Sequence, residues 1–310
     1  MALPAHSAAP VTLRLRDHGR YRVVVAEVRI VSWRPDHRAT LDEILEAEDE
    51  LSRQVRARHG ADADGPHWSR TVVAETDDGP VGVATVFATR WHPERLWVGI
   101  EVAPARRCSG VGAALVLAAK ETARSAGRPL RAKVLAGSPG AHFAEAHGFR
   151  VLQRSRTFRL RPPPAVVGED PEFVVDTDAA PDAVASAFLQ FYVRTHAWDP
   201  PGKIGAADVR RSHVDDAVAR LLVRDTDDSV LAVGCLYDET DGLLLSGGAT
   251  RDDPRAGPAT RALLEASAAL ARNLGQDLLV EADDAASEVV DELGARGGIV
   301  VGEVHIVSEA

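Results

Sequence analysis

Two parts of the chain repeat the same short motifs in the same order, and this repeat constrains the fold more than any other feature. The pattern V-R-x-x-x-W-x-P begins at Val28 and again at Val193. Further along, ARSAGRPL from Ala123 corresponds to ARNLGQDL from Ala271, at an offset of 148 residues. Several weak matches in one common order are hard to obtain by chance. We therefore infer two domains of one fold.

A proline-rich stretch lies between the two copies. RLRPPPAVVGEDPEF contains three consecutive prolines, each of which fixes its own torsion and disfavours helix in the residue before it. We expect one domain at 11–161 and a second at 171–310, joined by a linker at 162–170. The 310 residues suit two domains of about 150 residues each.

Hydrophobic periodicity in the first copy predicts an α/β fold, with a mixed sheet covered by helices. The expected helices are 21–33, 40–55, 110–127 and 139–148, and the expected strands are 11–16, 70–75, 80–89, 96–102, 130–135 and 149–160. The polar loop 57–68 is an insertion relative to the second copy. Such an insertion is either disordered or lines a substrate site, and both readings stay open.

The stretch VAPARRCSGVGAAL, residues 102–115, places two glycines where a strand passes into a helix. The first amides of a helix are unpaired and carry the positive end of its dipole, so they bind phosphate. Gly110 and Gly112 would let a pyrophosphate approach the backbone, and Arg106 and Arg107 add positive charge. The alternative is a tight turn that needs glycine only for its torsions.

The residues Arg107-x-x-Gly110-x-Gly112, preceded by Val102-x-Pro104, resemble the acyl-CoA-binding motif of the GNAT superfamily of N-acyltransferases. The later FAEAHGF resembles that family's closing helix and the start of its next strand. The resemblance covers residues 11–161 with a specific motif and 171–310 only as a degenerate copy. It implies two tandem GNAT-like domains, each with a mixed, largely antiparallel sheet flanked by helices.

The resemblance further implies transfer of an acetyl group from acetyl-CoA to a primary amine, by direct attack in a ternary complex. The backbone amide of Val102 would contact the pantetheine and polarise the thioester carbonyl. The residues that would hold the co-substrate are Val102, Ala103, Arg107, Cys108, Ser109, Gly110, Val111, Gly112 and Ala113.

Glu101, at the end of the strand before the glycines, is our candidate general base, because a carboxylate there could accept the proton of the amine. The competing interpretation is an ordinary strand carboxylate facing solvent. The family's tyrosine acid would stand at Ala144. Protonation of the leaving thiolate would then use His142, His147, water or no residue.

Trp33 is the best candidate for substrate binding, since it lies between the two expected helices where family members shape their acceptor pockets. Tryptophan is nevertheless more often a partly buried core residue. No metal site is expected. His142 and His147 lie five residues apart, on different helical faces, and the two cysteines form no ligand cluster.

Charge divides unevenly between the halves of the chain. Residues 1–161 carry a net charge of +7 and residues 162–310 one of −17, which together give −10. The basic half suits a polyanionic ligand and the acidic half favours a cationic small-molecule amine, although both could be solvated faces. The scattered arginines lack any nucleic-acid-binding motif. Without an apolar run of 18 residues or a signal peptide, we expect a cytoplasmic monomer or homodimer that binds no membrane.

The second copy has lost the glycines. Pro258 stands at the position of Gly110 and Thr260 at that of Gly112, and Asp252 and Asp253 make the loop acidic. Because proline has no amide proton, we predict that the C-terminal domain does not bind CoA productively. A second hypothesis for the whole chain is a non-catalytic acyl-CoA-binding, structural or sensor protein, motivated by the missing tyrosine.

Overall fold

A computed structural model describes residues 28–45, 49–161 and 172–309. The described residues divide into two compact units, the first comprising those up to Arg150 with Val307–Glu309 and the second comprising Val151–Ile306. Both combine helices with a mostly antiparallel sheet, which confirms the predicted fold class.

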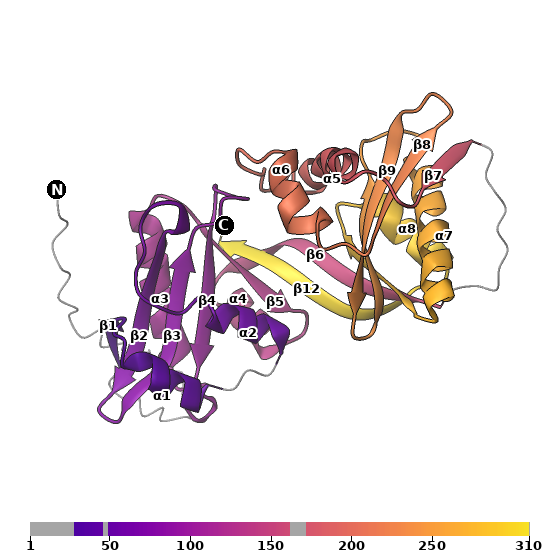
Figure 1. Cartoon of the computed structure of the whole chain (residues 1–310). Coiled ribbons are helices and arrows are strands. Elements are labelled where there is room, and N and C mark those ends of the chain that lie inside the picture. The colour runs from indigo at the N-terminus through magenta and orange to yellow at the C-terminus, as the bar shows by residue number, and fades with distance from the viewer. Residues whose placement is uncertain (1–27, 46–48, 162–171, 310) are drawn as a thin grey trace. The chain divides into compact units, whose positions relative to one another are not determined.

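The N-terminal unit contains one sheet with strand order β1-β2-β3-β4-β5, which can be followed in Figure 1. Its elements are β1 (Arg29–Ser32), α1 (His37–Ile44), α2 (Glu50–Arg56), β2 (Ser69–Thr76), β3 (Gly79–Phe87), β4 (Leu96–Val102), α3 (Val111–Ser125), β5 (Leu130–Leu135), α4 (Pro139–Ala146) and the start of β6 (Phe149–Leu160), with 3-10 turns at Gly65–His67 and Pro104–Arg106. Only the β4–β5 pair is parallel among these.

Helices cover both faces of this sheet. On one face, Val111 and Leu115 of α3 pack with Ala84 of β3. On the other, Leu41 of α1 packs with Val83, the neighbour of Ala84. Successive residues of a strand point to opposite faces, so α3 and α1 lie on opposite sides of β3. Along β4 the same alternation separates Val102, which packs with the α3 side, from Glu101.

The sequence-based helix at 21–33 is wrong in its described part, because Arg29–Ser32 form β1 and pair with β2 in antiparallel register. Ile30 and Val31 are β-branched and favour a strand. The helix expected at 40–55 is two helices, α1 and α2. The strand expected at 11–16 lies outside the described residues.

The C-terminal unit has the strand order β12-β6-β11-β10-β9-β8-β7. Its elements are β6, β7 (Phe173–Asp176), α5 (Pro181–Thr195), α6 (Ala206–Val209), a π-helical turn at Arg210–Val214, β8 (Ala219–Asp225), β9 (Val230–Glu239), β10 (Gly242–Ala249), α7 (Ala256–Leu274), β11 (Leu278–Asp283), α8 (Ser287–Ala295) and β12 (Ile299–Glu309). The order β8-β9-β10-β11 with α7 matches β2-β3-β4-β5 with α3, as the internal repeat predicted. The match V-R-x-x-x-W-x-P is not part of this agreement, because it falls on β1 in the first unit and at the end of α5 in the second.

Two strands are divided between the units. β6 belongs to the second unit from Val151 onward, and β12 returns to the first unit at Val307. There the hydroxyl of Ser308 donates a hydrogen bond to the carbonyl of Leu130 on β5, at 2.8 Å. The amide of Leu130 donates to the carboxylate of Glu309 at 3.4 Å. The expected linker at 162–170 lies outside the described residues, so the domain limits stay a prediction.

No helix in the described part of the chain is long and apolar enough to cross a membrane. Nor do the described residues bring together three or more histidine, cysteine, aspartate or glutamate side chains in a way that could hold a metal ion.

Candidate active site

A cavity of about 610 Å³ opens in the N-terminal unit where β4 and β5 separate. The two parallel strands pair only at Leu96–Leu130 and Trp97–Arg131. Beyond these positions the two strands line the cavity, β4 with residues 98–102 and β5 with residues 132–135. Further walls come from α2, from the start of α3 and from α4. The separation of two adjacent strands therefore creates the site.

The start of α3 forms one wall of this cavity, and its geometry explains Gly110. Gly110 is the N-cap residue, with φ of +89° and no side-chain capping bond. A Cβ atom added there would meet nothing within 4 Å, so the glycine is required for its torsion. Cys108 also has a positive φ, of +59°. The amides of the first helical turn have no partner within the helix, and the dipole makes this end attractive to an anion.

Gly112 has a different role from Gly110. A Cβ atom added to Gly112 would lie 3.0 Å from the ring of Phe143 on α4. Gly112 therefore allows α4 to pack against α3 beside the cavity, which both residues line.

The two arginines of the loop also differ. Arg106 forms an ion pair with Asp78 at 3.1 Å, whereas Arg107 lines the cavity and donates from Nε to the carbonyl of Val102 at 3.4 Å. The hydroxyl of Ser109 donates to the carbonyl of Arg106 at 2.6 Å. Arg107 is therefore the arginine that faces the predicted phosphate position.

Two predicted co-substrate contacts differ in direction along β4. The amide of Ala103 donates to the carbonyl of Val81 on β3, at 2.9 Å. Backbone groups of successive strand residues alternate in direction, so the Val102 amide points away from β3 and toward β5. Val102 lines the cavity.

The other predicted co-substrate residues are likewise divided. The cavity lining includes Val102, Arg107, Cys108, Gly110, Gly112 and Ala113 but not Ala103, Ser109 or Val111. The side chain of Val111 is buried in the core against β2 and β3.

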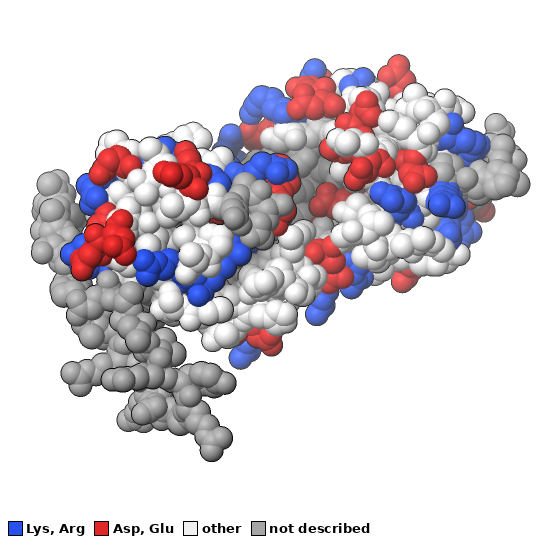
Figure 2. All heavy atoms as spheres, turned by 90° about the horizontal axis from the view of Figure 1, so that it is seen from below, with Lys and Arg blue, Asp and Glu red and all other residues white. Residues whose placement is uncertain are grey.

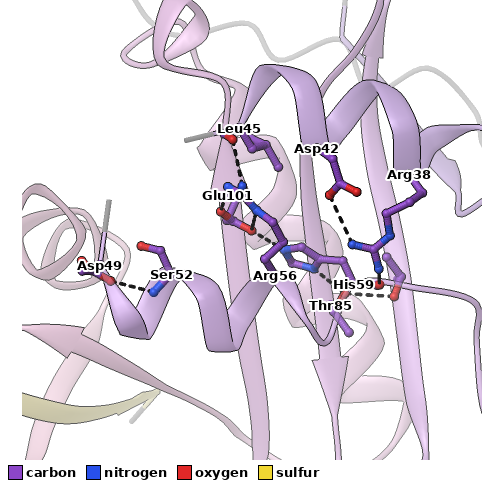
Figure 3. A network of polar contacts seen from close by, with 10 residues as sticks. Arg38, Asp42, Leu45, Asp49, Ser52, Arg56, His59, Thr85 and Glu101 are labelled. Atoms are coloured by element: carbon purple, nitrogen blue, oxygen red, sulfur yellow. Dashed lines mark hydrogen bonds and ion pairs between the residues drawn. The ribbon is translucent and has the colours of Figure 1, made fainter. Parts of the chain in front are cut away.

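Glu101 lines the cavity, and the side chains of Arg56 and His59 contact its carboxylate (Figure 3). Arg56 of α2 donates from Nη2 to Oε1 at 2.7 Å, and the ring Nε2 of His59 lies 3.0 Å from Oε2. Only 10% of the Glu101 side chain is exposed. The alternative prediction of an ordinary solvent-facing carboxylate does not describe this geometry.

Burial alone would raise the pKa of the Glu101 carboxyl, but the hydrogen bonds from His59 and Arg56 outweigh it and hold that pKa below its ordinary value. Glu101 is therefore a carboxylate at neutral pH. Because the pKa is lowered in the folded state, the interactions of this carboxylate stabilise the fold at neutral pH. They are lost as the pH falls through the lowered pKa.

Arg56 and His59 were not identified as site residues from the sequence. His59 lies in the polar insertion 57–68, and Arg56 is the last residue of α2. Arg56 also donates from Nη1 to the carbonyl of Leu45 at 2.8 Å. The sequence allowed two interpretations of the insertion 57–68, disorder or a place at a substrate site. The insertion supplies His59, which contacts Glu101.

Trp33 does not line the cavity. It is half-buried, packs against the core cluster that contains Leu41 and Val73, and meets the ring of His37 edge-on at 5.8 Å. The guanidinium of Arg38 lies 5.5 Å from its ring centroid. Its surroundings are those of a partly buried core residue.

The two histidines considered as general acids, His142 and His147, are likewise not at the cavity. Ala144 lines it, so no hydroxyl stands at the family's tyrosine position. His142 is exposed, and Nδ1 of His147 lies 2.8 Å from the carbonyl of Phe143. Neither histidine is part of the cavity lining.

The C-terminal unit fills the corresponding position with its own side chains. Thr250 donates its amide to Leu231 at 2.9 Å, as Ala103 does to Val81, which makes Ala249 the counterpart of Val102. The Ala249 amide donates to the carboxylate of Glu288 at 3.4 Å.

An ion pair and a changed helix start complete this difference. Arg194, which forms an ion pair with Glu288, donates to the carbonyl of Ala249 at 3.2 Å. Pro258 lies within the first turn of α7, and Thr260 is fully buried. The backbone groups that face the cavity in the first unit are thus already bonded in the second.

Charged side chains of both signs are interspersed over the described surface shown in Figure 2. In the C-terminal unit many carboxylates are paired, such as Asp182 and Asp215 with Arg210 and Glu292 with Arg261. The negative charge of these carboxylates is therefore partly offset locally by arginines.

Residues 67–151 match the sequence model of the acetyltransferase (GNAT) domain. None of the curated proteins matches the sequence. Among solved structures, the chain is similar to a GCN5-related N-acetyltransferase from Sphaerobacter thermophilus, with a TM-score of 0.62 and 19% identity over 91% of this chain and 95% of that one. It is also similar to a tandem GNAT protein from the clavulanic acid biosynthesis pathway, with a TM-score of 0.57 and 16% identity over 91% and 98% of the two chains.

Proposed function

The chain carries a GNAT acetyltransferase domain and has the fold of tandem GNAT proteins, and from this premise we propose that it transfers an acetyl group from acetyl-CoA to a primary amine. A GNAT domain supports acyl transfer in general. The observation that carries the finer proposal is the cavity between β4 and β5, which joins an anion-attracting helix start to a buried carboxylate.

We assign the co-substrate to the α3 side of the cavity. The first-turn amides of α3 and the guanidinium of Arg107 would hold its pyrophosphate. The Val102 amide would donate to the thioester carbonyl oxygen, where negative charge develops during attack. These groups fit an acyl-CoA because the amides are supplied by backbone that the glycine torsion exposes.

Glu101 would accept the proton of the amine. The amine nitrogen attacks the acyl carbon, the carbon–sulfur bond breaks, and the thiolate of CoA leaves. A thiol has a pKa near 8.5, so the thiolate can depart and be protonated by water without a side-chain acid. Ala144 at the family's tyrosine position is compatible with this route.

We propose that the acceptor is a small cationic amine with an apolar body. The carboxylates of Asp49 and Glu101 line the cavity and would attract an ammonium group. The neighbouring wall from α2 combines the aliphatic Leu51 and Val55 with Ser52.

One observation favours a second function, that of an acyl-CoA-binding protein without transfer activity. Ala144 removes the hydroxyl that the family uses as an acid, and the lowered pKa makes Glu101 a weaker base. Thiol release separates the two functions. With acetyl-CoA and a panel of aliphatic, aromatic and sugar amines, an acetyltransferase releases free CoA above background with at least one amine, whereas a binding protein releases none.

Calorimetry with acetyl-CoA is expected to give one binding site per chain. The second unit lacks the glycine loop, and the Ala249 amide is bonded to Glu288. A fitted stoichiometry of two would contradict the assignment of a single site. Absence of binding at high micromolar concentration would overturn the proposed function itself.

A further inference from the structure

His59 is a buried histidine with both ring nitrogens engaged, and Figure 3 shows its contact with Glu101. Its Nε2 lies 3.0 Å from Oε2 of Glu101, and its Nδ1 lies 2.8 Å from the hydroxyl of Thr85. The hydroxyl of Thr71 lies 2.9 Å from that of Thr85. Thr71 and Thr85 stand on β2 and β3, so the sheet itself fixes the ring.

The Glu101 carboxylate sets the direction of its hydrogen bond with His59. Because an ionised carboxylate only accepts, Nε2 of His59 carries a proton and donates it to Glu101. Arg56 donates to the other carboxylate oxygen at 2.7 Å. Both oxygens are thus bound on the side away from the cavity, which fixes the side-chain rotamer of Glu101.

Charged groups on the neighbouring elements contact this histidine or the threonines of its hydrogen-bond chain. α1 contributes Arg38, which donates to the His59 carbonyl and pairs with Asp42 at 3.4 Å. α2 contributes Arg56, and the loop before β2 contributes Asp62, which accepts from the amide of Thr71 at 2.9 Å. β4 contributes Glu101, the carboxylate that contacts the ring.

We infer that His59 is a positioning residue for Glu101, the proposed base: with Arg56 it holds this carboxylate charged and directed into the cavity. This inference rests on the proposed function for its catalytic consequence. Burial raises the pKa of Glu101 and the hydrogen bond from Nε2 lowers it, so loss of that bond raises the pKa. The acid limb of kcat/KM against pH then moves to higher pH, because a larger fraction of Glu101 is protonated at each pH.

Two substitutions of His59 by amide side chains distinguish the roles of its two ring nitrogens. His59→Asn places an amide near the position of Nδ1, where it can still bond Thr85 but does not reach Glu101. His59→Gln places an amide near the position of Nε2, where it can donate to Glu101. Both variants keep a polar side chain at a buried site, and both should therefore be tolerated by the fold.

The experiment is the pH dependence of kcat/KM for the wild type and both variants. We expect the acid limb to move up by about one pH unit in His59→Asn, and to return toward the wild-type position in His59→Gln. An unmoved limb in His59→Asn, or equal movement in both variants, would overturn the inference and leave His59 a purely structural residue.

A second measurement remains informative if the wild type transfers no acetyl group. The pKa of the Glu101 carboxyl can be followed by carbon-13 NMR in the protein without acetyl-CoA, with the resonance assigned by its loss in Glu101→Gln. The same rise in His59→Asn and recovery in His59→Gln are expected. If the NMR result holds while thiol release is absent, the positioning role stands and the proposed function fails.

Discussion

Replacing Glu101 with glutamine is expected to lower kcat for amine acetylation by about 100-fold to 10,000-fold, the range typical of losing a general base. Glutamine keeps the size of the side chain but cannot accept the amine proton. The affinity for acetyl-CoA should change little, because Glu101 points to the α2 side of β4 and the proposed CoA contacts lie at α3. Steady-state kinetics and calorimetry measure the two quantities separately.

Glu75 offers a matched control for this variant. Its Oε1 accepts from Arg34 at 2.6 Å and lies 2.9 Å from Nε2 of His37. Its side chain is 12% exposed, close to the 10% of Glu101, but it does not line the cavity. Glu75→Gln therefore disturbs a similar arginine–histidine–carboxylate group while leaving kcat unchanged. If both variants lose activity equally, the loss reflects folding and Glu101 is not the base.

Replacing Gly110 with proline is expected to weaken acetyl-CoA binding by about 100-fold, equivalent to loss of roughly 3 kcal/mol of hydrogen bonding to the phosphates. Proline fixes φ near −65°, whereas Gly110 has a φ of +89°. The substitution removes one amide and turns the following first-turn amides away from the cavity. Calorimetric titration with acetyl-CoA measures the loss.

Gly127→Pro is the control for this second variant. Gly127 follows the other end of α3, with φ of +68°, and a Cβ atom added there also meets nothing within 4 Å. The backbone cost is therefore comparable, but Gly127 is not part of the cavity lining. Unchanged binding in Gly110→Pro, or equal loss in the two variants, would remove the helix start from the proposed phosphate site.

The loop motif predicted the helix start that lines the cavity, because the requirements of a helix start are local. From the sequence, however, we predicted the same role for Gly110 and Gly112, which was to let a pyrophosphate approach the backbone. The structure separates them, since Gly110 needs its torsion and Gly112 accommodates Phe143. Phe143 lies on a different helix, and a contact of that kind leaves no trace in the spacing of the two glycines.

The surroundings of Glu101 could not be predicted for a similar reason. His59 precedes Glu101 by 42 residues and reaches it through a loop whose composition is that of a solvated insertion. Thr71 lies on β2 and Thr85 on β3, and the pairing of β2 with β3 brings them together. Their alignment depends on tertiary packing, which local periodicity does not report.

The division of β6 and β12 between the two units could not be predicted, because the sequence repeats. Both copies end in a strand, at β6 and β12, and each strand follows a short helix and a glycine. Two equivalent edges accept two equivalent strands, so the sequence pattern fits either pairing. The bonds of Ser308 and Glu309 to Leu130 decide between them.

That pairing has a consequence for biosynthesis. Ser308 leaves the ribosome 178 residues after Leu130, whose strand edge it completes. At a synthesis rate of about 5 to 20 residues per second, roughly 10 to 35 seconds pass between synthesis of β5 and synthesis of the end of its neighbour β12. During that interval the edge of the nascent N-terminal unit is open to pairing with other chains. The unit made first is thus the unit finished last, and a translational pause within the second copy lengthens its exposure to chaperones and to misassembly.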